Sequence, residues 1–398
     1  MRLGDIIEIK HGYAFSGENI IEEDNNVVLV TPGNFRIGGG FQEKKCKFFD
    51  GEIPQDYVLK AGDFIVTMTD LSKNIDTLGY SAWVPKSEKR IYLHNQRIGL
   101  VSLKNNKCDR GYIYWLMRTH AYQRTIANTS TGATVHHTSP SKIYEYECEV
   151  PDISIQHRIA TILSRYDSLI ENYQKQIKLL EEAAQRLYKE WFVDLHFPGH
   201  ENTKIVDGVP EGWEKKKVGD MISKIQRTKQ VTTNNYQASG KIPVIDQSRN
   251  YIAGYTDDAE CLVKVTVPYI VFGDHTRILK YIPFSFAKGA DGTQLIMSND
   301  LERMPQTLFY NSLIGIDLSN YSYARHFKYL KEEFVLLPSE HIARKYDSIV
   351  AKYYQSIQRS RELIRLLTEA RDRLLPKLMG GEIVLSLLIS HKYEANNK

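Results

Sequence analysis

The sequence predicts an α+β protein in which two mixed α/β globular domains are separated by two long antiparallel helices that pair as a coiled coil. Three observations predict this fold. The chain has 398 residues, enough for two or three hydrophobic cores. Two stretches rich in short strands and turns are each followed by a long amphipathic segment, and these two segments match in sequence. The expected pseudo-two-fold domain–helix repeat divides the chain into a first globular domain at 1–150, a central spacer helix at 151–194, a connector and second globular domain at 195–338, a C-terminal spacer helix at 339–381 and a tail at 382–398.

The composition is that of an ordinary soluble protein, with 42% hydrophobic and 25% charged residues. The net charge of +4 is small, so any nucleic-acid surface must be a local patch. The four cysteines are scattered without metal-type spacing, which favours a reducing compartment and no zinc site. The first residues do not resemble a signal peptide, and the apolar run 383–389 is too short to span a bilayer. These features predict a cytoplasmic protein without a membrane segment.

The first globular domain is expected to contain short strands separated by turns. Runs of β-branched and aromatic residues predict strands at Val27–Val30, Phe64–Met68 and Ile98–Leu103. Tyr112–Ile126 has the pattern of a helix, and Tyr144–Val150 that of a last strand before the break at Pro151. Between them, residues 128–142 form a hydroxyl-rich polar loop.

The central helix is predicted by apolar residues that recur at steps of three and four from Ile155 to Trp191. No Pro or Gly interrupts this stretch, and its other faces are charged. Such a helix would be roughly 55 Å long. An isolated helix cannot bury that stripe, so a partner helix is required.

The second globular domain, at about 214–338, has the same character as the first. Strands are predicted at Val263–Val267 and Tyr269–Phe272. Its opening, Val218-Gly219-Asp220, matches Leu3-Gly4-Asp5 at an offset of 215 residues. Between their shared ends the two domains have little sequence in common, so the scaffold repeats while the surfaces differ.

The partner helix begins near Ile342, where the apolar pattern returns. Tyr166-Asp167-Ser168-Leu169 corresponds to Tyr346-Asp347-Ser348-Ile349 at an offset of 180, and later positions correspond at an offset of 187. The difference is one heptad, which leaves the apolar seam in register. The residues expected to pair the helices or to contact partner subunits are Ile159, Tyr166, Leu169, Tyr173, Ile177, Leu180, Leu187, Tyr346, Ile349, Tyr353, Ile357, Leu367 and Leu374.

Motifs for catalysis are missing from the sequence. It has no phosphate-binding P-loop, no GxSxG elbow and no Asn/Asp-Pro-Pro-aromatic motif of adenine methyltransferases. His136-His137 could bind a metal, and Asp274-His275 could form a catalytic cluster, but a polar loop is the favoured explanation of each pair. We therefore predict no catalytic residues and no metal ligands, and a binding function.

Polar loops that mix cations with amides and hydroxyls occur in both globular domains, and such side chains contact phosphates and base edges. Taken alone, each loop could simply be solvated, but their presence in both halves favours a DNA-binding role. The candidate DNA-binding residues are Asn34, Arg36, Lys73, Asn74, Arg97, Thr134, His136, His137, Lys142, Arg227, Lys229, Gln247, Arg249, His275, Arg277 and Arg325.

The chain resembles the specificity (S) subunits of type I restriction–modification enzymes over nearly its whole length. The resemblance rests on the helix repeat, on Pro151–Gln156 before the first helix, on Pro210-Glu211-Gly212-Trp213 before the second domain, and on Ile270–Thr276. It implies that each globular domain is a target recognition domain that reads one half of a bipartite sequence in double-stranded DNA. The two helices would then set the distance between the half-sites.

The resemblance also implies partners that carry the chemistry. Two methyltransferase (M) subunits would bind the helices and domains and use S-adenosylmethionine, and restriction (R) subunits would use ATP and Mg. This chain would hold no cofactor and would be non-catalytic by itself, within a type I restriction deoxyribonuclease and adenine-specific methyltransferase complex. Two other classes of function remain open from the residues: a coiled-coil interaction scaffold without a DNA role, and a stand-alone nuclease that uses Asp274 and His275.

Overall fold

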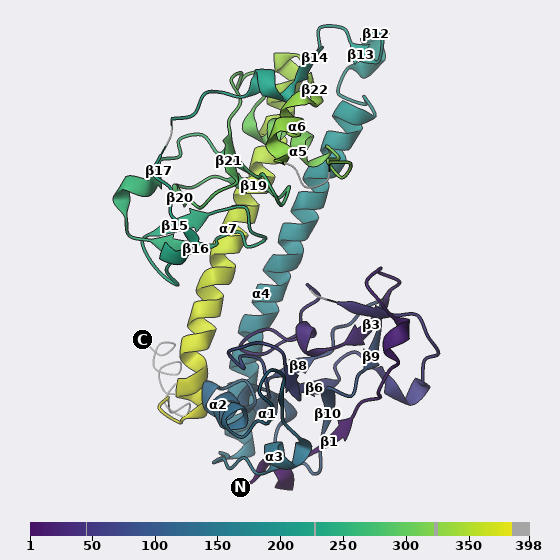
Figure 1. Cartoon of the computed structure of the whole chain (residues 1–398), viewed down its shortest axis with the longest axis vertical. Coiled ribbons are helices and arrows are strands. Elements are labelled where there is room, and N and C mark those ends of the chain that lie inside the picture. The colour runs from purple at the N-terminus through teal and green to yellow at the C-terminus, as the bar shows by residue number, and fades with distance from the viewer. Residues whose placement is uncertain (45, 227, 322–324, 384–398) are drawn as a thin grey trace, which may run out of the picture. The chain divides into compact units, whose positions relative to one another are not determined.

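The computed structural model describes residues 1–44, 46–226, 228–321 and 325–383 (Figure 1). The chain forms two compact units. The first contains Met1–Glu171 and the chain from Arg365 onward, and the second contains Asn172–Ile364. Each unit thus combines one globular domain with a part of both long helices. The α+β fold with two globular domains and two long helices is confirmed.

Two sheets, one mixed and one antiparallel, form most of the globular part of the first unit. In the five-stranded sheet β2-β4-β3-β9-β5, the neighbours β3 and β9 are parallel, whereas the four-stranded sheet β1-β10-β6-β8 is antiparallel. A short ribbon pairs β7 with β11. The bounds are β1 Ile7–His11, β2 Ile20–Ile21, β3 Val27–Val30, β4 Lys47–Phe49, β5 Val58–Leu59, β6 Phe64–Thr67, β7 Thr69–Asp70, β8 Ser81–Trp83, β9 Ile91–His94, β10 Ile98–Leu103 and β11 His136–His137.

Short helices complete this domain, and two of the predictions for it are wrong. Residues 112–126 do not form one helix, because the chain turns between α1 (Arg110–Leu116) and α2 (His120–Asn128). The Thr119 side chain caps α2 by accepting a hydrogen bond from the Tyr122 N–H, which fixes the break. Tyr144–Val150 is not a strand. It begins with the end of α3 (Pro140–Tyr144) and then forms one isolated bridge, between Glu147 and Arg2.

The second unit repeats this plan with different strands. The sheet β16-β15-β20-β17 contains a parallel pair, β15 with β20, and the sheet β19-β18-β21 is antiparallel. Two-stranded ribbons pair β12 with β13 and β14 with β22. The bounds are β12 Ile205–Val206, β13 Val209–Pro210, β14 Glu214–Lys217, β15 Ile242–Ile245, β16 Gly254–Thr256, β17 Leu262–Val263, β18 Tyr269–Gly273, β19 Leu279–Ile282, β20 Phe286–Lys288, β21 Thr293–Ile296, β22 Phe334–Leu337, α5 Gln306–Ile314 and α6 His326–Glu332.

The predicted strand at Val263–Val267 is wrong beyond its first residue, because β17 ends at Val263. The repeated Leu/Val-Gly-Asp motif has a packing reason in both units. A side chain on Gly4 would lie 2.7 Å from Tyr144 Cβ, and one on Gly219 would lie 3.1 Å from the Lys331 carbonyl oxygen. A side chain at Gly4 would require Tyr144 to move, and one at Gly219 would require its neighbour to shift by a few tenths of an ångström.

The two long helices are α4 (Ile153–Tyr188) and α7 (Glu340–Met379), and α4 continues into a π-helical turn at Lys189–Val193. In the second unit, Tyr346 Oη of α7 donates to the Ala184 carbonyl of α4 at 3.3 Å, and Ser360 Oγ lies 3.5 Å from Gln176 Oε1. Residue numbers rise along one helix while they fall along the other, so the segments are antiparallel.

In the first unit, the C-terminal turns of α7 join the core of the globular domain. Leu375 and Leu378 of α7 belong to the same buried cluster as Ile159 and Leu163 of α4 and Trp115 of α1. The helix pair is therefore part of the domain core and not a separate rod. Within the described part of the chain, no helix is both long and apolar enough to span a bilayer.

Candidate nucleic-acid interface

The candidate DNA-binding residues of the first domain lie mostly in loops at one edge of its sheets. The parallel strands β3 and β9 end at this edge, and β6 ends beside the start of β10. The backbone of Met68 accepts a hydrogen bond from Thr138 N–H at 3.0 Å and donates one to the Arg97 carbonyl at 2.9 Å. We call residues 31–37, 71–77, 95–97 and 131–138 the first loop edge.

Asp70 organises part of the first loop edge. Its carboxylate, which is 2% exposed, accepts hydrogen bonds from the N–H groups of Ser72, Thr77 and Leu78 at 2.6, 2.6 and 3.0 Å, and from Thr77 Oγ1 at 2.7 Å. Burial by itself would raise the pKa of Asp70, but these hydrogen bonds outweigh burial and hold the pKa below its usual range. Asp70 also pairs with His136 through the backbone. One carboxylate therefore fixes the loop that carries Lys73 and Asn74.

The second domain has loops at the corresponding strand ends. The parallel strands β15 and β20 end at the same edge of their sheet. The residues after β18, in the other sheet, contact the residues after β15, because His275 and Thr276 hydrogen-bond to Gln247. We call residues 246–250, 274–277, 289–292, 318–321 and 325–326 the second loop edge. The matching position in two domains of different sequence indicates one duplicated surface.

Gln247 joins three loops of the second loop edge. Its Nε2 donates to the Asp291 carbonyl at 2.9 Å, and its Oε1 accepts from the His275 N–H at 3.0 Å. The Gln247 carbonyl accepts from Thr276 Oγ1 at 2.7 Å. The side chain is thus committed to the protein, and the prediction that it contacts DNA directly is not supported by these contacts.

Asp274 and His326 hold the last loop of this edge. The Asp274 carboxylate accepts from the Phe327 N–H at 2.8 Å, and its backbone carbonyl lies 2.8 Å from His326 Nδ1. Both side chains are buried. Asp274, directly after β18, thus resembles Asp70, at the end of the short strand β7 that follows β6: each is a buried carboxylate that accepts backbone hydrogen bonds from a loop or helix start.

The buried ammonium group of Lys280 also stabilises the second loop edge. Lys280 Nζ donates to the carbonyl groups of Asp246 and Asn250 at 2.7 and 2.5 Å, at the two ends of the loop that carries Arg249. Burial lowers the pKa of Lys280 to about 8, although the Asp246 carboxylate lies 3.8 Å away. The conformation of residues 246–250 thus depends on one side chain of β19.

The structure separates the first-domain candidates into exposed and internal residues. The prediction that Asn34 binds DNA is wrong, because Asn34 is fully buried. Its Nδ2 donates to the Gln42 carbonyl and its Oδ1 accepts from the Thr31 N–H, so it cannot contact DNA. Lys142 lies outside the first loop edge, on α3, where it pairs with Glu145. The remaining candidates lie on the first loop edge, half-buried in the case of His136 and otherwise exposed: Arg36, Lys73, Asn74, Arg97, Thr134, His136 and His137.

The second-domain candidates divide in the same way. Arg249, His275 and Arg325 are exposed on the second loop edge. Arg277 is also exposed there, and its Nη1 donates to the Leu318 carbonyl at 3.1 Å. Lys229 lies away from this edge, and its ammonium group contacts Asp258 at 2.8 Å and Glu260 at 2.9 Å. Arg227 lies outside the described residues.

An ionic network that was not predicted from the sequence joins the first domain to the helices. Arg118 is 5% exposed, and its Nη1 contacts the Asp167 carboxylate of α4 at 2.5 Å, while its Nε donates to the Gly38 carbonyl at 2.8 Å. Arg371 of α7 contacts the other oxygen of Asp167 at 2.5 Å. Asp167 belongs to the repeated Tyr-Asp-Ser motif, so the repeat itself was a signal that could have identified it.

Most of the residues predicted to pair the helices have side chains that pack into the hydrophobic core of one of the two units. Ile159 and Leu374 contribute to the core of the first unit. Leu169 does not pair the helices, because its side chain is 45% exposed and its neighbour Ile170 is buried instead; a subunit contact of Leu169 stays a prediction. Tyr166, Tyr173 and Leu367 are half-buried and belong to neither of the two cores. The other predicted residues contribute to the core of the second unit: Ile177, Leu180, Leu187, Tyr346, Ile349, Tyr353 and Ile357.

The candidate metal and catalytic residues do not form such a site. Among the described residues, no three His, Cys, Asp or Glu side chains are close enough together to hold a metal ion. The Asp274 carboxylate is buried against the backbone of α6, so it is not presented to a substrate. The geometry therefore does not favour the nuclease alternative.

Comparisons of sequence and structure all find similarity to specificity subunits of type I restriction–modification systems. Residues 1–182 match the family model of the type I restriction modification DNA specificity domain. The chain is 27% identical over 300 residues to the type I restriction enzyme MjaIX specificity subunit of Methanocaldococcus jannaschii, with 68% of each protein covered. It is 28% identical over 99 residues to the EcoR124I/EcoR124II specificity subunit of Escherichia coli, covering 24% of each. Its fold is similar to the crystal structure of a type I restriction–modification S subunit from M. genitalium, with a TM-score of 0.58, 16% identity and 95% of each chain covered.

Proposed function

We propose that the chain is a specificity subunit of a type I restriction–modification system and that its two loop edges each read one half of a bipartite DNA target. One observation carries the proposal. Two domains with little common sequence place their free polar side chains at the same strand ends, in the first and second loop edges. A repeated frame with different side chains is what two different half-sites require.

The exposed residues of the loop edges have the chemistry for this task. Arginine and lysine bind phosphates or guanine, and asparagine pairs with adenine in the major groove. The first loop edge offers Arg36, Lys73, Asn74 and Arg97, and the second offers Arg249, His275 and Arg325. The net charge of +4 is small, so these residues would act as two local patches and not through the charge of the whole chain.

We further propose that the helices set the distance between the half-sites and bind two M subunits. Two exposed leucines support two equivalent docking places: Leu179 is 64% exposed and Leu366, its counterpart at an offset of 187, is 46% exposed. A repeated apolar residue left uncovered on both helices suits two copies of one partner. Leu169 adds apolar surface to α4.

In this proposal the reaction chemistry belongs to the partner subunits. The M subunits would supply S-adenosylmethionine-dependent adenine methylation, and R subunits would supply ATP- and Mg-dependent cleavage, in the cytoplasm. The specificity subunit contributes recognition and spacing. This division of roles is supported by the absence of catalytic motifs from the sequence.

The first test measures binding by the complex of this chain with its M subunits. We expect protection of one bipartite site, with affinity that falls steeply with salt, by about 0.9 log units per log unit of salt for each phosphate contacted. Footprinting on a random-sequence library at several salt concentrations measures both quantities. Equal affinity for every duplex would contradict the proposal, and no DNA binding at all would favour the scaffold alternative.

The second test changes the spacer. Asp167 contacts Arg371 in the first unit, and Gln176 lies against Ser360 in the second, so residues 169–175 and 362–368 lie between these pairs in α4 and α7. Deleting both heptads keeps the seam in register. The deletion also removes Leu169 and Leu366, so binding of both M subunits to the variant is measured first. It shortens each helix by about 10 Å, or about 3 base pairs. We expect the preferred spacer to shorten accordingly while both half-sites stay the same.

Methylation of a target library with varied spacers measures this effect. A variant of full length with Lys175 replaced by alanine is the control, because Lys175 is exposed on α4. An unchanged spacer in an active deletion variant would refute the role of the helices as a ruler.

A further inference from the structure

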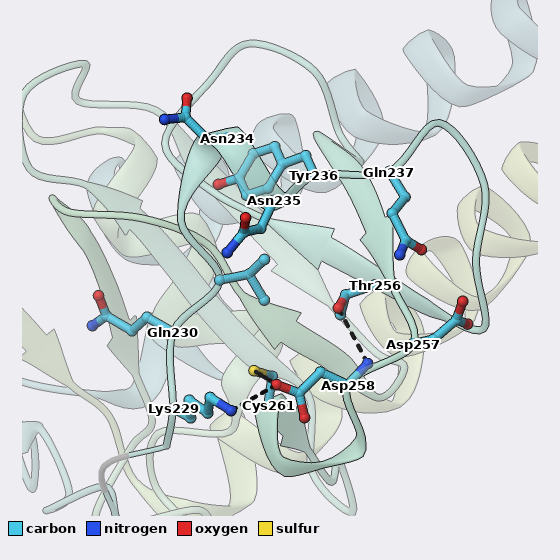
Figure 2. A pocket seen from close by; sticks show the side chains of 11 residues that line it. Lys229, Gln230, Asn234, Asn235, Tyr236, Gln237, Thr256, Asp257, Asp258 and Cys261 are labelled. Atoms are coloured by element: carbon cyan, nitrogen blue, oxygen red, sulfur yellow. Dashed lines mark hydrogen bonds and ion pairs between the residues drawn. The ribbon is translucent and has the colours of Figure 1, made fainter.

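A polar hollow in the second domain has no role in the function proposed so far. It has a volume of about 540 Å³ and lies between the segment 229–237, the end of β16 and the turn before β17. Figure 2 shows the side chains that line it, with Lys229 directed at Asp258. Four of the lining residues carry carboxamides: Gln230, Asn234, Asn235 and Gln237.

The wall that carries these carboxamides is fixed to the second loop edge. The Val231 N–H donates to the Lys288 carbonyl at 3.0 Å. The Tyr236 hydroxyl accepts from the Ala290 N–H at 3.1 Å and lies 3.4 Å from the Asp246 carboxylate. Ala290 and Asp246 belong to the second loop edge, so DNA bound at that edge would come close to the hollow.

The carboxamides are available to a ligand. All four are exposed, and in the described part of the chain none of them makes a side-chain hydrogen bond to another protein group. Each offers an acceptor and two donors in one plane, which matches the N7 and N6 groups of adenine in the major groove.

The charges of the hollow favour base edges over phosphates. Lys229 is held by Asp258 and Glu260 at 2.8 and 2.9 Å, and these carboxylates raise its pKa, so its charge is neutralised within the protein. Asp257 accepts the Lys241 N–H with one oxygen. Carboxylates repel phosphate but accept hydrogen bonds from the amino groups of adenine and cytosine.

We propose that this hollow reads base edges in the second half-site, with Asn234, Asn235 and Gln237 as specificity-determining residues for amino-bearing bases, adenine above all. The inference rests on the proposed function and adds to it. The exposed arginines of the second loop edge hold the backbone, and the carboxamides of the hollow distinguish the bases.

The test replaces Asn234, Asn235 and Gln237 by alanine together and measures binding of the complex with M subunits to a library of target variants. We expect a loss of discrimination of about tenfold or more at one or two base pairs of the second half-site. The first half-site should be read as before. The dependence of affinity on salt should not change, because no phosphate contact is removed. Asn106→Ala, at an exposed carboxamide of the first domain, is the matched control and should leave both half-sites unchanged.

The other outcomes separate this inference from the proposed function. A uniform loss of affinity with a weaker salt dependence would show a phosphate contact and overturn the inference. Unchanged discrimination by the triple variant, beside a specific wild-type complex, would overturn it as well and leave the proposed function intact. A wild-type complex without any bipartite preference would overturn both.

Discussion

Replacing Asp167 by alanine should lower the free energy of unfolding of the first unit by about 3–5 kcal/mol, because it leaves a buried arginine without its counter-ion. The Arg118 side chain is 3% exposed and the Asp167 side chain 23%. Arg118 also stacks on Trp115, with 4.2 Å from its guanidinium to the ring centroid, so it cannot swing into water without losing this contact. Arg371, 13% exposed, would lose the same partner.

Hydrogen exchange measured by mass spectrometry is the suitable readout, because it reports on each helix separately. Protection should decrease in α1, α2 and the first turns of α4, and the midpoint of urea unfolding should fall. The matched control is Asp347→Ala, at the corresponding position of the repeat, where the carboxylate accepts only a hydroxyl bond from Thr307, at 2.6 Å, among the described contacts. We expect a loss of about 1–2 kcal/mol there. Equal losses of unfolding free energy at both positions would show that the Arg118–Asp167 ion pair does not stabilise the first unit more than a single hydroxyl hydrogen bond does.

Replacing Asp70 by alanine should abolish discrimination at the half-site read by the first domain while the other half-site is still read. The change leaves the N–H groups of Ser72, Thr77 and Leu78 without their acceptor, at about 1–3 kcal/mol for each buried group. The loop with Lys73 and Asn74 would then lose its fixed conformation. Each specified base pair normally contributes about 1–3 kcal/mol of discrimination. Methylation of half-site libraries by the complex with M subunits measures the effect.

The reciprocal variant makes this prediction specific. Asp274→Ala should disturb the second half-site and leave the first one unchanged, and Asp56→Ala, at an exposed carboxylate of the first domain, should change neither. If Asp70→Ala weakened discrimination at both half-sites equally, Asp70 would act on the stability of the whole protein and not on the position of its loop.

The Asp70 carboxylate also predicts a pH dependence. Because its pKa is lowered in the folded protein, its stabilising contribution is complete above the usual carboxyl pKa of about 3.9. The contribution is lost as the pH falls through the lower, folded value. Hydrogen exchange in residues 71–78 should therefore increase only below about pH 4, and Asp70→Asn should remove this dependence.

The long helices could be predicted from the sequence because their signal is local and periodic. The apolar steps from Ile155 to Trp191 and the repeat at Tyr346 located α4 and α7 to within a few residues. The details of the seam could not be predicted. A straight helix drifts from a heptad pattern, and the globular domain covers part of the same face, so Ile170 is buried where Leu169 was expected.

Short elements were less predictable, because tertiary contacts decide them. Val27–Val30 and Ile98–Leu103 were predicted with the bounds of β3 and β10, since buried strands have a clear composition. Tyr144–Val150 has the same composition, but Tyr144 closes α3 and packs over Gly4. The domain bounds given by the sequence stay a prediction.

The sequence by itself determined that this protein is a repeat of a domain and a helix. The apolar periodicity of each helix and the matching motifs of the two copies can both be read from residue order alone. It also identified the polar loops, because their composition is local. Only the tertiary structure decided which side chains in those loops are free, since their partners come from distant parts of the chain. Gln247 is tied to Asp291 and His275, and Lys229 to Glu260. Whether a polar side chain can bind DNA depends on whether the fold has already used its hydrogen bonds and its charge.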